Sequence, residues 1–317
     1  MEGNSTVGNK PPKKPNDAYS IQPKDYEDPK GSLEDRIDKI SWDDVILDPK
    51  IKKELQDYAI GIACPETYSY YGLDPVRNLL LIGEPGCGKT ISVKAMASEN
   101  NFDLLVIKTS DITDMWYGES ERKMQEAFNQ ARKISEENQR TCVLYFDEID
   151  SIAEKRDMSH EATRRVMSVL LQNMDGIEKK GNVYVVASTN RIESLDPALT
   201  RPGRFDLILK VDVPKYEQLV QLYEHYVHKV RSKAKKDYID PINCQELAVK
   251  STGFTGADVE YIVKKTCSEK MWKDYTLEYK MQDTHLVSDD FIRTITEYDP
   301  TRGGSKGRGK IIKGFGG

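Results

Sequence analysis

Residues 83–90 constrain the fold of this chain more than any other stretch. They read Gly-Glu-Pro-Gly-Cys-Gly-Lys-Thr and match the phosphate-binding pattern G-x-x-x-x-G-K-[ST]. The apolar run before them, 79–82, is typical of a buried parallel strand, and the segment after them, 91–100, has the apolar spacing of a helix. A glycine-rich turn alone is usually only a loop. The flanking strand and helix are the context in which the pattern predicts a phosphate-binding loop.

The residue types in this loop explain how it would hold phosphate groups. Glycines let the backbone wrap closely around phosphate oxygens, so that main-chain N–H groups point inward. The helix N-terminus adds a partial positive charge. The pattern assigns Lys89 to the β- and γ-phosphates and the Thr90 hydroxyl to Mg²⁺. The predicted nucleotide-binding residues of this segment are Gly83, Glu84, Pro85, Gly86, Cys87, Gly88, Lys89, Thr90 and Ile91.

Length and composition limit the class of protein. A chain of 317 residues predicts about two domains, and its net charge of −5 argues against a general nucleic-acid binder. The five cysteines show no C-x-x-C spacing, which predicts no zinc site, and their odd number fits a reducing compartment. The sequence has no apolar run of membrane-spanning length and no N-terminal apolar signal core. We therefore expect a soluble intracellular protein, cytoplasmic or nuclear.

Strands and helices alternate after the phosphate loop. Helical spacing at 121–138 and 161–174 lies between apolar runs that are typical of buried strands. Alternation of this kind predicts an α/β fold, a three-layer sandwich with a mostly parallel sheet covered on both faces. The runs predicted as strands after the first are 104–107, 142–146, 183–187 and 207–211.

The strand pattern stops at Pro214, and only helical patterns follow. We predict a large α/β phosphate-loop domain at 37–213 and a small all-helical lid domain at 214–299. Residues 1–36 are rich in proline and charge and predict a disordered arm, either a passive tail or a partner-docking segment. Residues 300–317 predict a basic, glycine-rich flexible tail, for which solvation is favoured over nucleic-acid contact.

Two further strands end in polar residues. Asp147 and Glu148 follow an apolar run, at a strand end that would face the phosphates in a phosphate-loop protein. There Asp147 could hold Mg²⁺ and Glu148 could deprotonate the attacking water. Without the phosphate loop, two surface acids would be the better interpretation. Asn190 ends the next strand and could bind the γ-phosphate or the attacking water, although a simple turn residue is equally compatible with its position.

Two other stretches combine unusual residue types. Arg201 and Arg204 lie three apart in a Pro-Gly turn, and their guanidinium groups suit phosphate oxygens, either as fingers toward a neighbouring subunit or as surface ion-pair partners. Trp116 and Tyr117 precede a glycine in a predicted loop. Burial is the usual fate of such aromatics, but exposure in a loop would let them grip a partner.

Taken together, these motifs resemble the AAA family of ATPases over about residues 40–299. Residues 83–90 look like the Walker A motif, 143–148 like Walker B, and Asn190 like sensor 1. The Arg-Pro-Gly-Arg spacing resembles the branch of valosin-containing protein, the proteasomal ATPases and the membrane-bound AAA proteases. The resemblance makes Arg201 and Arg204 arginine fingers that act on the adjacent subunit's ATP, and Trp116 and Tyr117 a substrate-gripping pore loop.

The same resemblance assigns the nucleoside end of the site. Gly256 and Ala257 match the segment at the sensor 2 position, and His225 matches a helix histidine near the nucleotide. Asp44 and Ile46 resemble the stretch that holds adenine through backbone contacts. This chain has Ile46-Leu47 where the family usually has Gly-Gly.

The resemblance implies an activity and an assembly. It implies Mg²⁺-dependent ATP hydrolysis coupled to the remodelling, unfolding or disassembly of protein substrates through a ring pore. The ring would be a homo-hexamer or a hetero-oligomer, and adaptors could deliver the substrates. Two alternatives stay open at this point, a nucleotide-gated assembly or scaffold protein and a nucleic-acid-stimulated motor, although the net charge argues against nucleic acid as a partner.

Overall fold

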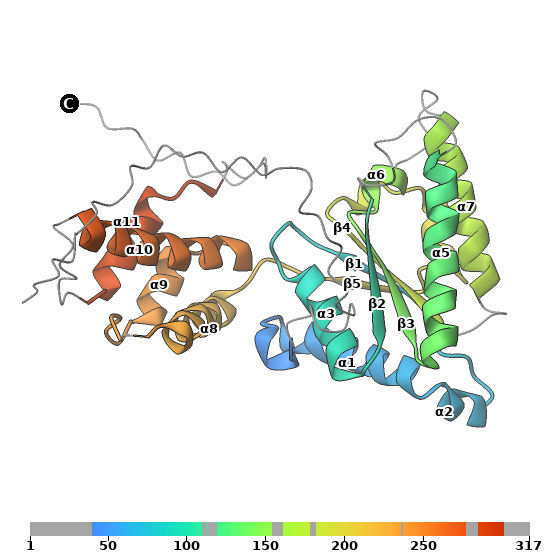
Figure 1. Ribbon diagram of the computed structural model, residues 1–317, viewed down its shortest axis with the longest axis horizontal. Coiled ribbons are helices and arrows are strands. Elements are labelled where there is room, and N and C mark those ends of the chain that lie inside the picture. Colours follow the sequence, from blue (N-terminus) through green and yellow to red (C-terminus); the bar gives the residue numbers. More distant parts are fainter. Residues whose placement is uncertain are drawn as a thin grey trace, which may run out of the picture. The chain divides into compact units, whose positions relative to one another are not determined.

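The computed structural model describes residues 40–109, 112, 119–153, 161–177, 182–235, 237–276 and 285–300 (Figure 1). The predicted N-terminal arm, residues 1–36, and nearly all of the predicted tail lie outside this part of the chain. Trp116 and Tyr117, the predicted pore-loop residues, lie outside it as well. The assignments of the arm, the tail and the pore loop therefore stay predictions.

Five parallel strands form one sheet in the order β2-β3-β4-β1-β5. All five lie where the apolar runs predict them, which confirms the parallel sheet. Two of them extend further at their carboxyl ends than apolar character alone predicts, because the polar residues Asp147, Ser188 and Thr189 remain in the ladder. The strands are β1 (Asn78–Ile82), β2 (Asp103–Lys108), β3 (Cys142–Asp147), β4 (Val183–Thr189) and β5 (Leu207–Lys210).

The sheet is the middle layer of three. Side chains alternate between its two faces along each strand, so that Leu80 packs into one apolar core while Leu79 and Leu81 pack into the other. The first core is covered by α5 (Glu119–Asn138), α6 (Asp150–Ala153) and α7 (Glu161–Ile177), and the second by α1 (Pro49–Ala63) and α3 (Lys89–Glu99) (Figure 1). This arrangement confirms the predicted three-layer sandwich.

Short elements connect these layers. A 3-10 turn, η2 (Trp42–Asp44), precedes α1, whose first turn is capped by Asp48: its side chain accepts a hydrogen bond from the Lys50 amide at 3.0 Å. The sequence patterns did not predict α2 (Pro65–Tyr70), η3 (Ile192–Ser194) or η4 (Pro197–Thr200). Each is too short to show a helical period.

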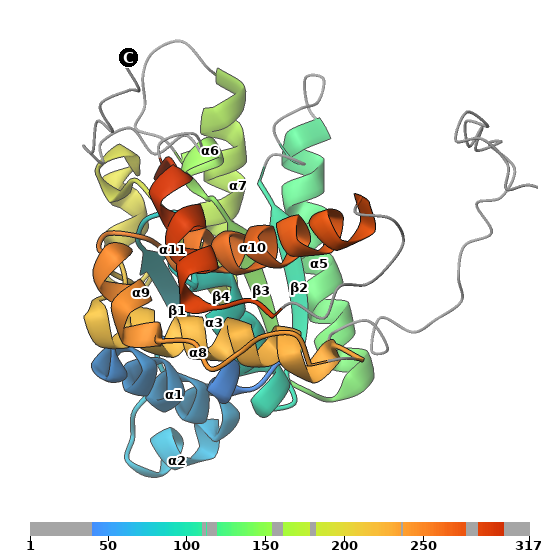
Figure 2. The same cartoon turned by 90° about the vertical axis from the view of Figure 1, so that its left-hand side faces the viewer.

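The chain continues as helices after β5 (Figure 2). They build an apolar core of their own, within which the Tyr223 hydroxyl and the Ser251 hydroxyl lie 2.6 Å apart. None of the described helices has both the length and the apolar character needed to cross a membrane. The helices described in this region are α8 (Tyr216–Lys233), α9 (Cys244–Lys250), α10 (Gly256–Thr276) and α11 (Ser288–Glu297).

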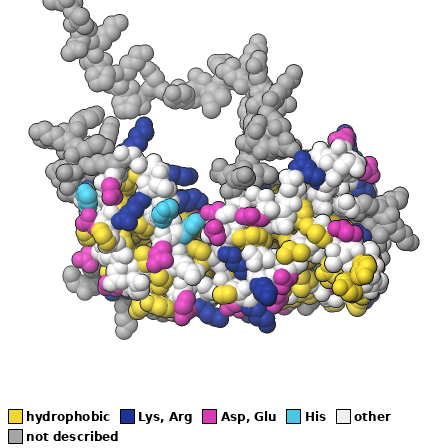
Figure 3. Space-filling view, turned by 90° about the horizontal axis from the view of Figure 1, so that it is seen from below, with side chains coloured by type: hydrophobic (Ala, Val, Ile, Leu, Met, Phe, Trp, Pro, Cys, Tyr) yellow, Lys and Arg dark blue, Asp and Glu magenta, His cyan; other side chains and the backbone are white. Residues whose placement is uncertain are grey.

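One face of the molecule shows how charge is distributed over the surface. In the view from below, Lys and Arg side chains lie among Asp and Glu side chains, and histidines are grouped toward the left of the view (Figure 3). A groove that binds nucleic acid usually presents a basic stripe instead. The charge pattern of this face therefore gives no support to a nucleic-acid partner.

Candidate functional site

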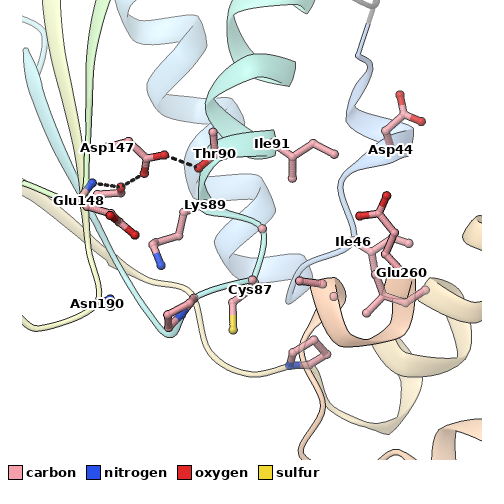
Figure 4. Close-up of a pocket in the computed structure, with 18 of the residues that line it drawn as sticks. Asp44, Ile46, Cys87, Lys89, Thr90, Ile91, Asp147, Glu148, Asn190 and Glu260 are labelled. Atoms are coloured by element: carbon pink, nitrogen blue, oxygen red, sulfur yellow. Dashed lines mark hydrogen bonds between the residues drawn. The ribbon is translucent and has the colours of Figure 1, made fainter. Parts of the chain in front are cut away.

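The candidate site lies where the carboxyl ends of three neighbouring strands meet. Because β3, β4 and β1 are adjacent and parallel, the segments that follow them emerge at the same edge of the sheet. A cavity of about 320 Å³ opens there (Figure 4). Its lining includes fourteen of the predicted site residues: Asp44, Ile46, Pro85, Gly86, Cys87, Gly88, Lys89, Thr90, Ile91, Asp147, Glu148, Asn190, Gly256 and Ala257.

The phosphate loop is held tightly between the sheet and helix α10. Gly86 has a φ of +76°, and a Cβ at this position would lie 2.7 Å from the Ala257 Cβ and 2.9 Å from the Thr255 Oγ1. The Ala257 amide donates a hydrogen bond to the Gly86 carbonyl at 3.2 Å. A Cβ at Gly83 would lie 2.1 Å from the Val211 carbonyl oxygen. Only glycine fits these two positions, so the loop backbone itself forms the wall of the cavity.

Lys89 folds back over the loop that precedes it. Its Nζ donates to the carbonyl oxygens of Gly83 at 2.6 Å and of Glu84 at 3.0 Å, which uses two of the three ammonium donors. Burial lowers the pKa of Lys89, while nearby charges, including those of Asp147 and Glu148, act in the opposite direction. Gly83 and Glu84 themselves are not part of the cavity lining; they contribute the carbonyls that position this ammonium group.

Two oxygens that could hold a magnesium ion face each other. The Thr90 Oγ1 lies 3.3 Å from the Asp147 Oδ2, and both residues line the cavity (Figure 4). Carboxylate and hydroxyl oxygens are the hard ligands that Mg²⁺ prefers, and the ion usually keeps several waters and substrate phosphates as its other ligands. Among the described residues no group of three or more His, Cys, Asp or Glu side chains is arranged to hold a metal. The pair Thr90 and Asp147 therefore fits a magnesium site with few protein ligands, in which phosphate oxygens complete the ligand set.

Glu148 adopts a backbone conformation that is rare for a residue with a side chain. Its φ is +57°, which costs on the order of 1–2 kcal/mol. Hydrogen bonds hold it there: the Glu148 amide donates to the Ser188 Oγ at 3.2 Å, and the Glu148 carbonyl accepts from the Thr109 Oγ1 at 2.6 Å. This turn directs the chain away from the sheet directly after Asp147. The Glu148 side chain consequently reaches the cavity.

Asn190 contributes a polar atom without a partner. Its side-chain Oδ1 is buried and accepts no hydrogen bond, although the residue lines the cavity. An unsatisfied buried acceptor costs about 1–3 kcal/mol. A water molecule could donate to this oxygen, whereas a phosphate oxygen could not. The Nδ2 of the same amide could donate to a phosphate oxygen, so contact with water and contact with the γ-phosphate both stay predictions for Asn190.

The opposite end of the cavity is more apolar. Ile46, Asp44 and Glu260 lie there, on the opposite side from Asp147 and Glu148 (Figure 4), and Leu222 and Tyr226 of α8 also line the cavity. The sequence did not predict Leu222, Tyr226 and Glu260 as site residues, because nothing in a helical stripe distinguishes a cavity wall from a core. Pro214 completes this wall.

His225 is not among the residues that line the cavity, and its assignment near the nucleotide stays a prediction. Its Nε2 is 4.0 Å from the Asp44 Oδ1, so it reaches the cavity only through that carboxylate. Burial lowers the pKa of His225, and the Asp44 carboxylate opposes that effect. Tyr226, the residue of α8 that follows His225, does line the cavity.

The two predicted arginine fingers are not brought to this cavity. Arg204 is held within its own chain: Nε and Nη2 donate to the two Asp175 carboxylate oxygens, each at 3.1 Å, and Nη1 donates to the Ala198 carbonyl at 2.8 Å. Arg201 is exposed. The two arginines thus differ in their surroundings: the Arg204 guanidinium group is hydrogen-bonded within its own chain, whereas Arg201 is exposed to solvent.

Comparisons with known proteins agree with this geometry. Residues 79–213 match the family described as ATPase family associated with various cellular activities (AAA). The chain is also 34% identical over 232 residues to a protein of Archaeoglobus fulgidus named Cell division cycle protein 48 homolog. That similarity covers 72% of this chain and 30% of the relative, so the chain matches less than a third of the relative's length.

Because the phosphate loop is tightly packed against α10, adding one methyl group at Gly86 should destabilise the fold more than adding one at an open glycine. Gly203→Ala introduces a side chain at a φ of +86° into open space, and we expect it to lower the free energy of unfolding by about 1–2 kcal/mol. Gly86→Ala adds a clash with Ala257 to a similar φ penalty, and we expect a further loss of about 1–3 kcal/mol. Urea denaturation measures both. Equal losses for the two variants would contradict the contact between the loop and α10.

Proposed function

Because the chain belongs to the AAA family of ATPases, we propose that it hydrolyses ATP in the presence of Mg²⁺ and uses the reaction to remodel, unfold or disassemble protein substrates. The observation that carries this proposal is the meeting of Lys89, Thr90, Asp147, Glu148 and Asn190, from the ends of three strands, around one cavity. We also propose that the chain divides into the α/β domain 37–213 and the helical lid domain 214–299.

In the proposed reaction each wall of the cavity has its own task. The backbone of 83–90 and the start of α3 bind the phosphates, and Lys89 balances their charge. Asp44, Ile46, Gly256 and Ala257 hold the nucleoside, with His225 acting through Asp44. These assignments put the phosphates at the strand ends and the base against the helical domain.

The hydrolytic step depends on the strand-end residues. Mg²⁺, held through Thr90 and Asp147, would neutralise the charge on the β- and γ-phosphate oxygens. Glu148 takes a proton from the attacking water, and the Asn190 Oδ1 accepts a hydrogen bond from the same water and orients it. The rigid turn at Glu148 supports this role because a general base must be held within hydrogen-bonding reach of its proton.

We propose that the chain works as a ring, a homo-hexamer or a hetero-oligomer, in which Arg201 and Arg204 reach a neighbouring subunit's nucleotide. The exposure of Arg201 at a distance from its own cavity supports an action in trans. Arg204 would have to leave Asp175 to do the same, so a role in holding the turn for Arg201 is also compatible with its contacts. Trp116 and Tyr117 are proposed to grip substrate in the ring pore, with adaptors as possible partners, in an intracellular, cytoplasmic or nuclear setting.

The alternatives differ from this proposal in measurable ways. A nucleotide-gated scaffold would bind ATP and turn it over negligibly, whereas a nucleic-acid motor would hydrolyse it faster when DNA is added at low salt. The complete set of strand-end residues favours turnover over simple binding. A protein-remodelling ATPase should be stimulated by unfolded protein and not by DNA.

The role of Glu148 predicts a separation of binding from turnover. Glu148→Gln keeps the shape of the side chain but removes the base, and we expect turnover to fall about 10²–10⁴-fold while affinity for ATP is retained. Glu193→Gln, an exposed acid in η3, serves as the matched control and should behave as wild type. Steady-state hydrolysis and equilibrium nucleotide binding measure the two quantities. Undiminished hydrolysis by Glu148→Gln would remove the basis of the assigned chemistry.

Action in trans predicts complementation between two inactive chains. Arg201→Ala should lower turnover about 10³-fold without loss of stability, whereas Arg191→Ala, another exposed arginine, should have no effect. Arg204→Ala should also lower the free energy of unfolding, by roughly 1–2 kcal/mol, because its hydrogen bonds within the chain are lost.

Mixing the Arg201→Ala chain with the Glu148→Gln chain should restore hydrolysis, because the first supplies an intact cavity and the second an intact arginine. Titration of the mixture against total protein should show activity rising with assembly. If the mixture has only the averaged activity of its two components at every concentration, the arginine does not act on a neighbour.

A further inference from the structure

Tyr145 carries a buried hydroxyl group at the edge of the candidate magnesium site. It lies in β3 two residues before Asp147, so both side chains project from the same face of the sheet. Its ring is fully buried in the apolar core on the α1 and α3 side. Its hydroxyl lies 2.9 Å from the Asp147 Oδ1 and 3.2 Å from the Thr90 Oγ1. One phenol group thus touches both residues that are assigned to Mg²⁺.

The single proton of this hydroxyl determines the direction of the neighbouring hydrogen bonds. Asp147 has only acceptors when ionised, so Tyr145 donates to it. Tyr145 then has no proton for Thr90, so in the contact between their hydroxyls only Thr90 can donate, and its one proton has two acceptors within reach, the Tyr145 hydroxyl and the Asp147 Oδ2.

This proton arrangement suits a metal ligand. A hydroxyl oxygen binds a cation through a lone pair, so its proton has to point to an acceptor elsewhere. When a cation lies between Thr90 and Asp147, the Asp147 Oδ2 no longer accepts that proton. Tyr145 would then provide the other acceptor for the Thr90 proton.

Tyr145 also acts on the orientation of the carboxylate. The Asp147 Oδ1 accepts from two donors, Tyr145 and the Ser188 hydroxyl at 2.6 Å. The other oxygen, Oδ2, is thereby left directed toward Thr90. Partners of this kind fix the rotamer of a metal-binding carboxylate, and their loss typically weakens metal binding about 10–100-fold.

We propose that the Tyr145 hydroxyl is a positioning residue for the magnesium site, which turns Asp147 Oδ2 and a lone pair of Thr90 toward the same cation. The inference rests on the proposed function, because it needs the site to bind Mg²⁺ with a nucleotide. It adds to the magnesium site a residue, Tyr145, that the sequence pattern assigns to the apolar part of β3.

A matched pair of tyrosines separates this role from packing. Tyr145→Phe keeps the buried ring and removes only the hydroxyl. Tyr184 on the neighbouring strand β4 is buried in the same core, and the Arg77 guanidinium lies 5.6 Å from its ring centre. Tyr184→Phe therefore controls for the loss of a buried phenol without a change at Thr90 or Asp147.

The test measures binding of a fluorescent, non-hydrolysable ATP analogue by the full chain, first in EDTA and then as Mg²⁺ is titrated. We expect Tyr145→Phe to raise the half-saturating Mg²⁺ concentration about tenfold or more, with affinity in EDTA unchanged. Tyr184→Phe should match wild type in both conditions. Electron paramagnetic resonance of Mn²⁺ in place of Mg²⁺ should report the same difference directly on the metal.

The outcomes distinguish this inference from the proposed function. If wild type responds to Mg²⁺ and Tyr145→Phe responds at the same concentration, the inference is wrong and the proposed function stands. Equal weakening in EDTA and in Mg²⁺ would also overturn it, because that result indicates general damage to the cavity. If wild type binds no analogue in either condition, both proposals fail. Ser188→Ala, which removes the other donor to Asp147 Oδ1, should shift the Mg²⁺ response in the same direction.

Discussion

Parallel pairing of β3, β4 and β1 is the constraint on which the rest of the site depends. In register, Phe146 lies opposite Ala187, and Ile82 lies opposite Thr189, so the three strands end at nearly the same level. Only this alignment brings a glycine loop, two acids and an asparagine from distant parts of the sequence to one cavity. The fully apolar interior of the strands keeps the alignment fixed, because a slip of one residue would move every side chain to the opposite face.

The cavity also joins the sheet to the helices that follow it. The Ala257 amide donates to the Gly86 carbonyl, and Ile46 packs against the core of the helical region while it lines the cavity. A molecule held between the loop and these residues contacts both parts of the chain at once. Such shared contacts are a physical route by which a bound nucleotide would bias the position of the helices.

The sequence predicted those features that depend on local pattern. The phosphate loop, the five strands and the helices around them follow from residue type and period, and Asp147, Glu148 and Asn190 follow from their position at strand ends. Ser188 and Tyr145 were not predicted as site residues, because Tyr145 belongs to an apolar strand run, Ser188 directly follows one, and only the register shows which atoms they meet. The pairing of Arg204 with Asp175 joins residues 29 positions apart, and no spacing rule gives such a contact. Tyr226 lines the cavity one residue after His225 on α8, and such a difference is finer than a helical stripe resolves.

Hydrogen–deuterium exchange with and without a non-hydrolysable ATP analogue and Mg²⁺ tests most directly whether this cavity holds the nucleotide. The account predicts that the analogue slows exchange at the amides of the phosphate loop, of the turn at Glu148 and of the first turn of α10, while the distant helix α5 is unchanged. Those segments come from three separate regions of the sequence, and all of them line the cavity. Unchanged exchange in all three, under conditions where the analogue is bound, would mean that the nucleotide lies elsewhere and would contradict the account.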